Sequence, residues 1–452
     1  MASRVREAVA PAYLFLCLIA GGSAQGIWAN MVLQLLGIAI IGWAAMSRSA
    51  EPAPARALFG IVLAALALVA LQLVPLPASV WPHVGGREAI ASGYRVLGIA
   101  VPAVPVSLAP YDSLQALLTL IPPIAMLCAM LRLKAYRPAW LALALLGGTF
   151  CGILLGVLQV ASGNPLTSPW YLYPDVSFGF ATGFFANANH MAILLVIGLP
   201  FVAALVAAAR GASRQRQHAV AVMAAGATLV LVVGIALNGS LAGYGLAVPL
   251  LAASALIVMP ARSPLIRWVA IFGGLFLIVA VGVLESSSTR PNGFGAEAAS
   301  SVESREDMLA TTWAAARNFL PLGSGVGTFR RVYDLYDDHD RVTGTYVVHA
   351  HNDYAELLLE AGIPGLAILI LFLAWWGRAA WRAWSSAEAG PFARAASIAS
   401  AAILVHSLVD FPLRTAAISA AFAMCLSLLA DRRAVTASAT SDLRPTRHIV
   451  LG

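Results

Sequence analysis

The stretch NHMAILLVIGLPFVAALVAAA, residues 189–209, decides the fold class. It contains no Asp, Glu, Lys or Arg, and its length matches the ~20 apolar residues that a helix needs to cross a bilayer core. Directly after it come Arg210, Arg214 and Arg216, and clusters of basic residues are typical of loops on the cytoplasmic side of a membrane. The stretch therefore predicts a transmembrane helix that ends in the cytoplasm.

The composition of the whole chain agrees with this prediction. Of the 452 residues, 60% are hydrophobic and 11% are charged, and the mean hydropathy is +0.82. An average soluble domain is ~45–50% apolar and ~25% charged, so an ordinary soluble enzyme and a disordered chain are excluded. We predict an all-α polytopic membrane protein with about twelve transmembrane helices. The predicted spans are 11–28, 31–46, 57–74, 113–131, 138–160, 189–209, 219–237, 241–259, 267–284, 362–377, 394–409 and 413–430.

The basic residues define one orientation for these spans. With the N-terminus in the cytoplasm, 19 of the 28 Lys and Arg residues fall on the cytoplasmic side, as the positive-inside rule requires. An even number of spans then places both termini in the cytoplasm. The net charge of +7 divides into +14 inside and −7 outside, so it reflects topology and gives no reason to invoke nucleic acid.

The spans divide the chain into four regions, and the third is the longest polar segment between spans. In that region the residues after Ser301 predict a helix to about Asn318, with a face of Met308, Leu309, Thr312, Trp313 and Ala316 at helical spacing. A loop over 321–327 and a second short helix over 328–338 follow. The regions are 1–284 with spans one to nine and periplasmic segments 75–112 and 161–188, the large periplasmic loop 285–361, spans ten to twelve over 362–430, and the cytoplasmic tail 431–452.

Titratable residues are concentrated outside the membrane. Transporters and pumps usually carry carboxylates or Arg within their spans, and the middle of these spans is nearly free of them, which disfavours a transporter or flippase. Titratable groups are concentrated in the outer segment 303–360, together with Asp410 and Arg414. We therefore expect the functional site at the outer membrane–water boundary.

The densest cluster of such residues is HAHNDYAE, residues 349–356. A neutral imidazole such as that of His349 or His351 can accept a proton near neutral pH, and Asp353 or Glu356 can orient its ring. Two alternatives stay open: both histidines only hydrogen-bond the loop backbone, or they are metal ligands. Further ligands for a metal are not evident in the sequence.

Other polar groups in the outer loop are less specific. The run Asp334, Asp337, Asp338, His339 and Asp340 is interpreted as a solvated loop face, with contact to sugar hydroxyls or a loosely held divalent ion as the alternative. The glycine-rich segment 323–327 follows no predicted strand, so it does not indicate a nucleotide site. The outer cations that can hold a phosphate are Arg305, Arg330, Arg331, Arg341 and Arg414.

The run HAHNDYAELLLEAGIPGL, residues 349–366, resembles the signature of the O-antigen ligase and polysaccharide polymerase superfamily. That signature is His-Asn, nine residues, then Gly-x-x-Gly, and here it is met by His351, Asn352, Gly362 and Gly365. Three flanking motifs agree with it: GFFANANHMA at 183–192, ARNFLPLGSGVGTF at 316–329 and HSLVDFPLRTAA at 406–417.

The resemblance implies a GT-C-like membrane glycosyltransferase with a large helical periplasmic loop between helices 9 and 10. Its donor would be a glycan on undecaprenyl diphosphate, its acceptor a glycan or lipid A–core, and its surroundings the lipids of the bacterial inner membrane. It implies an inverting reaction on the periplasmic face without cofactor or metal, with His351 as the catalytic residue. The residues expected to bind substrate are His349, Asn352, Arg305, Arg330, Arg414, Asp353, Glu356, Asn189 and His190.

The sequence departs from the family pattern at two positions. Ala188 and Leu241 stand where many relatives carry Arg for the diphosphate, and we take Arg305 as the first candidate to replace them. The VDFPL segment, residues 409–413, resembles polymerase members, so we expect a polymerase of O-antigen or exopolysaccharide units. A ligase that joins glycan to lipid A–core, transfer to a protein, and a non-catalytic membrane scaffold stay open.

Overall fold

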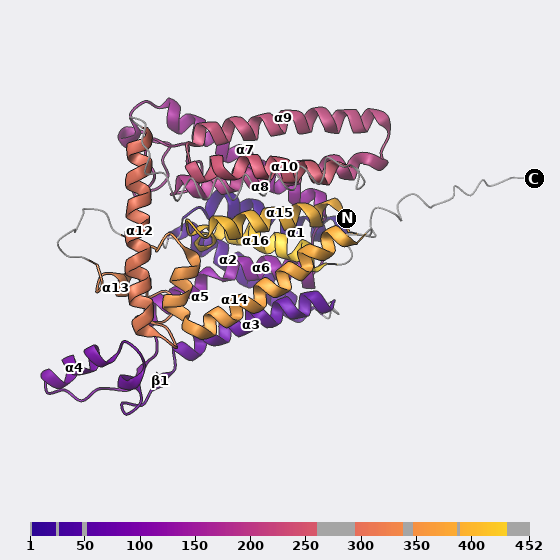
Figure 1. The fold of residues 1–452 in the computed structure, drawn as a ribbon. Helices are drawn as coiled ribbons and strands as arrows, with labels where there is room; N and C mark the ends of the chain where they lie inside the picture. The colour runs from indigo at the N-terminus through magenta and orange to yellow at the C-terminus, as the bar shows by residue number, and fades with distance from the viewer. Residues whose placement is uncertain are drawn as a thin grey trace, which may run out of the picture.

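The computed structural model describes residues 2–23, 27–47, 52–259, 294–337, 347–386 and 389–431. Long apolar helices run side by side as a bundle, and one further helix crosses an end of it (Figure 1). The bundle helices are α1 (Ala2–Ala20), α2 (Trp28–Met46), α3 (Ala53–Gln72), α5 (Pro110–Thr119), α6 (Ile121–Leu127), α7 (Pro138–Ala161), α8 (Ala188–Ala208), α9 (Arg214–Asn238), α10 (Leu241–Val258), α14 (Asp353–Ser385), α15 (Pro391–His406) and α16 (Ala416–Ala430).

These helices confirm the all-α polytopic membrane fold. Within the described residues, eight helices are long and apolar enough to cross a membrane, and α15 and α16 are shorter apolar helices. Eleven of the twelve predicted spans coincide with helices, with α5, α6 and a π-helical turn over Cys128–Arg132 forming one of them. The predicted span 267–284 lies outside the described residues, as does nearly all of the tail 431–452.

Two predicted boundaries were wrong. The first helix ends at Ala20 and not at residue 28, because Gly21 and Gly22 lie against other backbone; a Cβ on Gly22 would stand 2.0 Å from the Phe184 carbonyl oxygen. Helix α14 begins at Asp353, nine residues before the predicted span. It bends at Gly362, whose φ of +58° is accessible to glycine and whose neighbour Ile363 donates to the Pro321 carbonyl at 2.9 Å.

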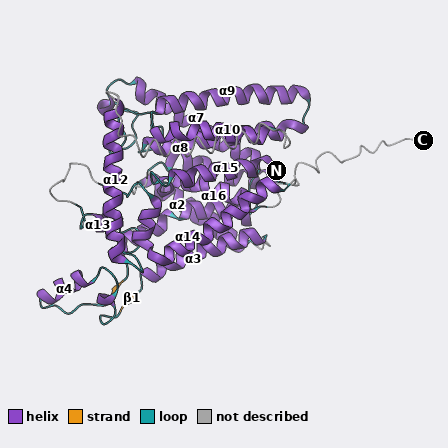
Figure 2. Ribbon diagram, in the orientation of Figure 1, coloured by secondary structure: helices purple, strands orange, loops and turns teal. Residues whose placement is uncertain are grey.

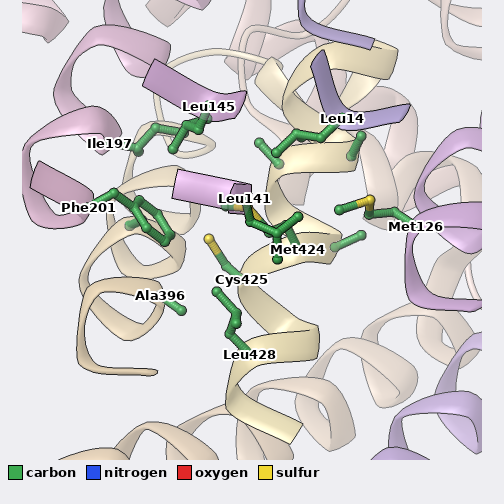
Figure 3. Packing of buried hydrophobic residues seen from close by; sticks show 14 of the residues in the cluster. Leu14, Met126, Leu141, Leu145, Ile197, Phe201, Ala396, Met424, Cys425 and Leu428 are labelled. Atoms are coloured by element: carbon green, nitrogen blue, oxygen red, sulfur yellow. The ribbon is translucent and has the colours of Figure 1, made fainter. Parts of the chain in front are cut away.

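The centre of the bundle is α8, which is the most deeply buried of the candidate spans. Its side chains pack against α7, α9, α10 and α15, which explains why residues 189–209 are apolar on every face of the helix. Figure 3 shows part of this core, in which Ile197 and Phe201 of α8 lie near Leu145 and Leu141 of α7 and Cys425 of α16. The core fixes the outer ends of these helices, where the polar residues gather.

Helix α12 (Phe294–Phe319) lies across the end of the bundle opposite to the start of α1 (Figure 1). The predicted outer helix is thus confirmed, although it begins seven residues before Ser301. Its buried side chains are Met308, Thr312, Ala315, Ala316 and Phe319, whereas Leu309 and Trp313 are exposed, contrary to the predicted face. The second helix, α13, is shorter than predicted and covers Phe329–Tyr333.

The segment between α3 and α5 contains the two short strands of the described residues. Strand β1 (Pro75–Leu76) pairs antiparallel with β2 (Val104–Pro105), and the short helix α4 (Glu88–Val96) projects from the bundle beside them (Figure 2). Arg87 is fully buried there and donates to the carbonyls of Gly85, Val106 and Gly323. This side chain therefore links the segment to the loop that follows α12.

Candidate active site

The catalytic candidate His351 lies at the start of α14. Asn352 is the N-cap of this helix: its side-chain oxygen accepts from the backbone N–H groups of Tyr354 and Ala355, both at 3.0 Å. The preceding residue, His351, has a φ of +50°, which non-glycine residues rarely adopt. Such strain is concentrated at functional sites, and here it turns the imidazole toward the α15–α16 connection.

The centre of the site is Asp410, which follows α15 and is fully buried. Its Oδ1 lies 3.5 Å from Nδ1 of His351 and 3.8 Å from Nε2 of His190, and its Oδ2 lies 3.9 Å from Nε2 of His406. Two shorter contacts hold the carboxylate: the Asn189 amide donates to Oδ2 at 2.6 Å, and the Phe411 N–H donates to Oδ1 at 2.8 Å. One carboxylate therefore faces three imidazoles.

The electrostatics of this group favour a charged carboxylate. Burial alone would favour its neutral form, but the hydrogen bonding and charges of the His190 and His351 side chains outweigh burial and hold the pKa of Asp410 well below its ordinary value. A buried carboxylate that stays ionised can stabilise the imidazolium that forms when His351 accepts a proton. The 3.5 Å contact is long, and such contacts are often longer without substrate.

Phe411 separates the histidines from one another. The centroid of its ring lies 4.4 Å from that of His349, 4.9 Å from that of His351 and 5.1 Å from that of His190. The two signature histidines therefore pack against the same ring but face different carboxylates.

The partner of His349 is Glu356. Nδ1 of His349 lies 2.8 Å from Oε1 of this glutamate, whose Oε2 accepts from the Ala350 N–H at 3.0 Å. The guanidinium of Arg414 lies 3.1 Å from Glu356, 3.5 Å from Glu360 and 3.5 Å from Asp353. These carboxylates outweigh the effect of burial and raise the pKa of Arg414, so the guanidinium stays charged. The negative charges of the same carboxylates already compensate its positive charge.

The other predicted cations lie at different places. Arg305 is half-buried on α12, within electrostatic range of His406. Arg330 and Arg331 are exposed on α13, and Arg331 pairs with Asp112 at 3.2 Å. Of the acidic run, Asp334 is exposed, while Asp338, His339 and Asp340, like Arg341, lie outside the described residues.

The structure thus assembles two adjoining groups from the predicted residues. Asn189, His190 and His351 surround Asp410, whereas His349, Asp353 and Glu356 belong with Arg414. Asn352 contributes as a helix cap, and its amide also donates to the Leu408 carbonyl at 2.9 Å. Sequence reasoning did not assign roles to Asp410, His406, Phe411 and Glu360. A usable signal existed, because His406 and Asp410 stand four residues apart at the end of an apolar run.

The described residues contain no group of three or more His, Cys, Asp or Glu side chains arranged to hold a metal ion. They do place the imidazole of His351 beside the charged carboxylate of Asp410. The His351 side chain is 27% exposed and is therefore open to a substrate. This arrangement is suited to removing a proton from a hydroxyl group.

The fold and the site define a polytopic helical membrane protein with a buried His–Asp cluster at one end of its bundle. Residues 226–370 match the family model described as O-antigen ligase. This match supports the resemblance of the chain to the O-antigen ligase and polysaccharide polymerase superfamily. The match runs from α9 into α14, so it includes His349, His351 and Glu356 but neither Asn189 nor Asp410. No curated protein matches the chain.

Proposed function

We propose that this protein transfers a glycan from an undecaprenyl-diphosphate carrier to an acceptor hydroxyl on the periplasmic face of the inner membrane. The family supports a membrane function of the ligase or polymerase type, with a lipid-linked glycan as substrate and a glycan as acceptor. The observation that carries the proposal is the His351–Asp410 pair at the outer end of the bundle.

In the proposed step, His351 accepts the proton of the acceptor hydroxyl. Its Nδ1 faces Asp410, so Nε2 is the nitrogen left for substrate. The hydroxyl oxygen attacks the anomeric carbon, and the bond from that carbon to the diphosphate oxygen breaks with inversion. The electron pair of that bond leaves with the lipid diphosphate, and Asp410 stabilises the imidazolium. His351 then returns its proton to water.

The leaving diphosphate needs positive charge nearby. Arg414 is a poor source, because three carboxylates already surround its guanidinium. Arg305 is the better candidate, since it lies on the outer helix within electrostatic range of His406 and therefore near the Asp410 group. In this proposal Arg305 replaces the arginines absent at Ala188 and Leu241, and catalysis needs no metal.

The membrane orientation belongs to the same proposal. With both termini in the cytoplasm, α12 and the Asp410 group lie on the periplasmic side, where lipid-linked glycans are assembled into larger polymers. Among the described spans few charged side chains are deeply buried in mid-membrane, which supports an enzyme rather than a transporter or flippase.

Within this class we propose a polymerase of O-antigen or exopolysaccharide repeat units. The test is incubation of the reconstituted protein with a defined lipid-diphosphate oligosaccharide and two acceptors, a second lipid-linked oligosaccharide and lipid A–core. A ladder of products supports the polymerase, whereas a single addition to lipid A–core would replace it with the ligase. Failure to transfer to either acceptor, by protein that is folded, would contradict the proposed function.

A further inference from the structure

The carboxylate of Asp410 is held by a chain of side chains that reaches into two other helices. The Ser240 hydroxyl donates to Oδ1 of Asn189 at 2.7 Å, and Nδ2 of Asn189 donates to Oδ2 of Asp410 at 2.6 Å. Ser240 is the N-cap of α10, and its oxygen accepts from the Gly243 N–H at 3.2 Å. Every hydrogen bond in this chain therefore has a fixed direction.

The direction of these bonds matters because an amide can bind in two orientations. With its oxygen accepting from Ser240, the Asn189 amide presents its N–H to Asp410; a flip would turn the amide oxygen toward a carboxylate that only accepts, and this bond would be lost. Oδ2 of Asp410 is then occupied, and Oδ1, which also accepts from the Phe411 N–H, faces His351. A carboxylate held in this way presents an acceptor in a fixed position, 3.5 Å from Nδ1 of His351.

Further hydrogen bonds hold the helix ends that carry Asn189 and Ser240. The buried Asn238, at the end of α9, donates to the carbonyls of Ala181 and Ala188 at 2.9 and 3.1 Å. These bonds fix the start of α8 next to the start of α10, and with it the distance between Asn189 and Ser240. Both polar atoms of the Asn189 amide are thus committed within the protein, which leaves it poorly placed as a substrate ligand.

We propose that Asn189 and Ser240 are positioning residues, which act on the reaction through Asp410 and His351 without touching the substrate. This inference rests on the proposed function of His351. It assigns α8 and α10 a part in catalysis: their N-termini set the orientation of the carboxylate that holds the catalytic ring. Small misplacement of a catalytic group can lower a rate by about 100-fold, so the effect is measurable.

The experiment compares Asn189→Leu and Ser240→Ala with two matched variants. Ser240→Thr keeps both the hydroxyl and the cap, and Ser254→Ala removes another buried serine of α10, whose hydroxyl donates only to the Leu250 carbonyl. We expect kcat to fall about 10- to 100-fold in Asn189→Leu and less in Ser240→Ala, with KM for donor and acceptor unchanged. Ser240→Thr should restore most of the rate, and Ser254→Ala should retain it.

Three outcomes would overturn the proposal. A rise in KM with kcat unchanged would make Asn189 a substrate ligand. Loss of folded protein with normal kcat per folded molecule would make the chain merely structural. Equal losses in Ser240→Thr and Ser240→Ala would show that the hydroxyl is not what matters.

A second readout separates this proposal from the proposed function. Diethyl pyrocarbonate modifies the free nitrogen of histidine, and mass spectrometry resolves each site. At fixed pH, Asn189→Leu should change the rate of modification of His351 several-fold and leave that of His83, on the outer segment, unchanged. If the wild type transfers no glycan but this difference persists, the proposed function fails and the positioning role stands. An unchanged rate at His351 contradicts the positioning role.

Discussion

At the scale of single residues, the site depends on one buried carboxylate. Asp410 contacts side chains from α8, from α15 and from the loop before α14, so it joins three parts of the chain that are far apart in sequence. Its pKa lies well below its ordinary value of 3.8, because interactions with His190 and His351 outweigh the effect of burial. This shift links the site to the stability of the whole protein.

The expected consequence is a stability contribution that depends on pH. Because the unfolded chain binds the proton at a higher pH than the folded one, Asp410 stabilises the fold fully above its ordinary pKa and loses this contribution as pH falls below it. We expect Asp410→Asn to cost about 1–3 kcal/mol at pH 7 and clearly less near pH ~3. Unfolding in detergent, followed by Trp fluorescence at both pH values, measures the difference; an equal loss at both would contradict it.

A second prediction at this scale concerns Arg305. If it binds the diphosphate, Arg305→Ala should raise KM for the lipid-linked donor about 10-fold or more, because a charge-assisted contact is lost, and should leave KM for the acceptor unchanged. Arg317→Ala, which removes another arginine of α12, stacked on Trp313, is the matched control. Unchanged donor dependence in Arg305→Ala would reject this role.

The sequence revealed the residues that lie close together along the chain and missed those that meet only in space. His349, His351, Asn352 and Glu356 share one motif, so spacing alone identified them. Asp410 lies over fifty residues later, and its importance arises from how the α15–α16 connection packs on α8 and on the loop before α14. Arg414 was identified as a cation, but its compensation by three carboxylates required the folded arrangement.

At the scale of elements, apolar length predicted the membrane helices well and their ends less well. Helix ends depend on caps and on close backbone contacts, such as Asn352 at the start of α14 and Gly22 after α1, which hydropathy does not report. Hydropathy also does not report how the outer segments are held. Nothing in the sequence predicted that Arg87, in the segment between α3 and α5, would be buried.

Arg87 gives the sharpest test of how the outer elements are held. Burial lowers its pKa to about 10, and it binds three backbone carbonyls and lies over the ring of Phe319, 5.8 Å from its centroid. We expect Arg87→Met to cost about 2–4 kcal/mol, since buried carbonyls lose their donors. Arg95→Met, which breaks an exposed pair with Glu88, should cost about 0–1 kcal/mol.

The measurement is thermal unfolding of both variants in the same detergent, together with limited proteolysis of the segment between α3 and α5. Arg87→Met should expose this segment to cleavage, while Arg95→Met should not. Equal stability of the two variants would show that the outer segment does not depend on the buried guanidinium.

At the scale of the whole molecule, the protein is a membrane bundle with its chemistry gathered at one end. Helix α12 crosses that end, and the site lies between the starts of α8, α10 and α14 and the turn after α15 (Figure 1). The matched residues 226–370 include His351. Asn189 precedes them in the chain and Asp410 follows them. Residues on both sides of the matched segment are therefore part of the site.

The proposed topology is tested by single cysteines in a background without the four native ones. Leu166→Cys is exposed in the segment after α7, and Gly211→Cys is exposed in the turn between α8 and α9. A membrane-impermeant maleimide should label Leu166→Cys once the outer membrane is opened, and Gly211→Cys only after the inner membrane is broken. The reverse pattern would invert the orientation and place the site in the cytoplasm.

The central claim is that His351, oriented by Asp410, carries out glycan transfer. The most direct measurement is the rate of transfer from a defined lipid-diphosphate oligosaccharide by the wild type, His351→Ala and His351→Asn in proteoliposomes. Asparagine tolerates the positive φ of this position, so His351→Asn keeps the loop while removing the base. We predict that both variants fold and that transfer falls at least ~100-fold in each. Transfer at the wild-type rate by either folded variant would contradict the account.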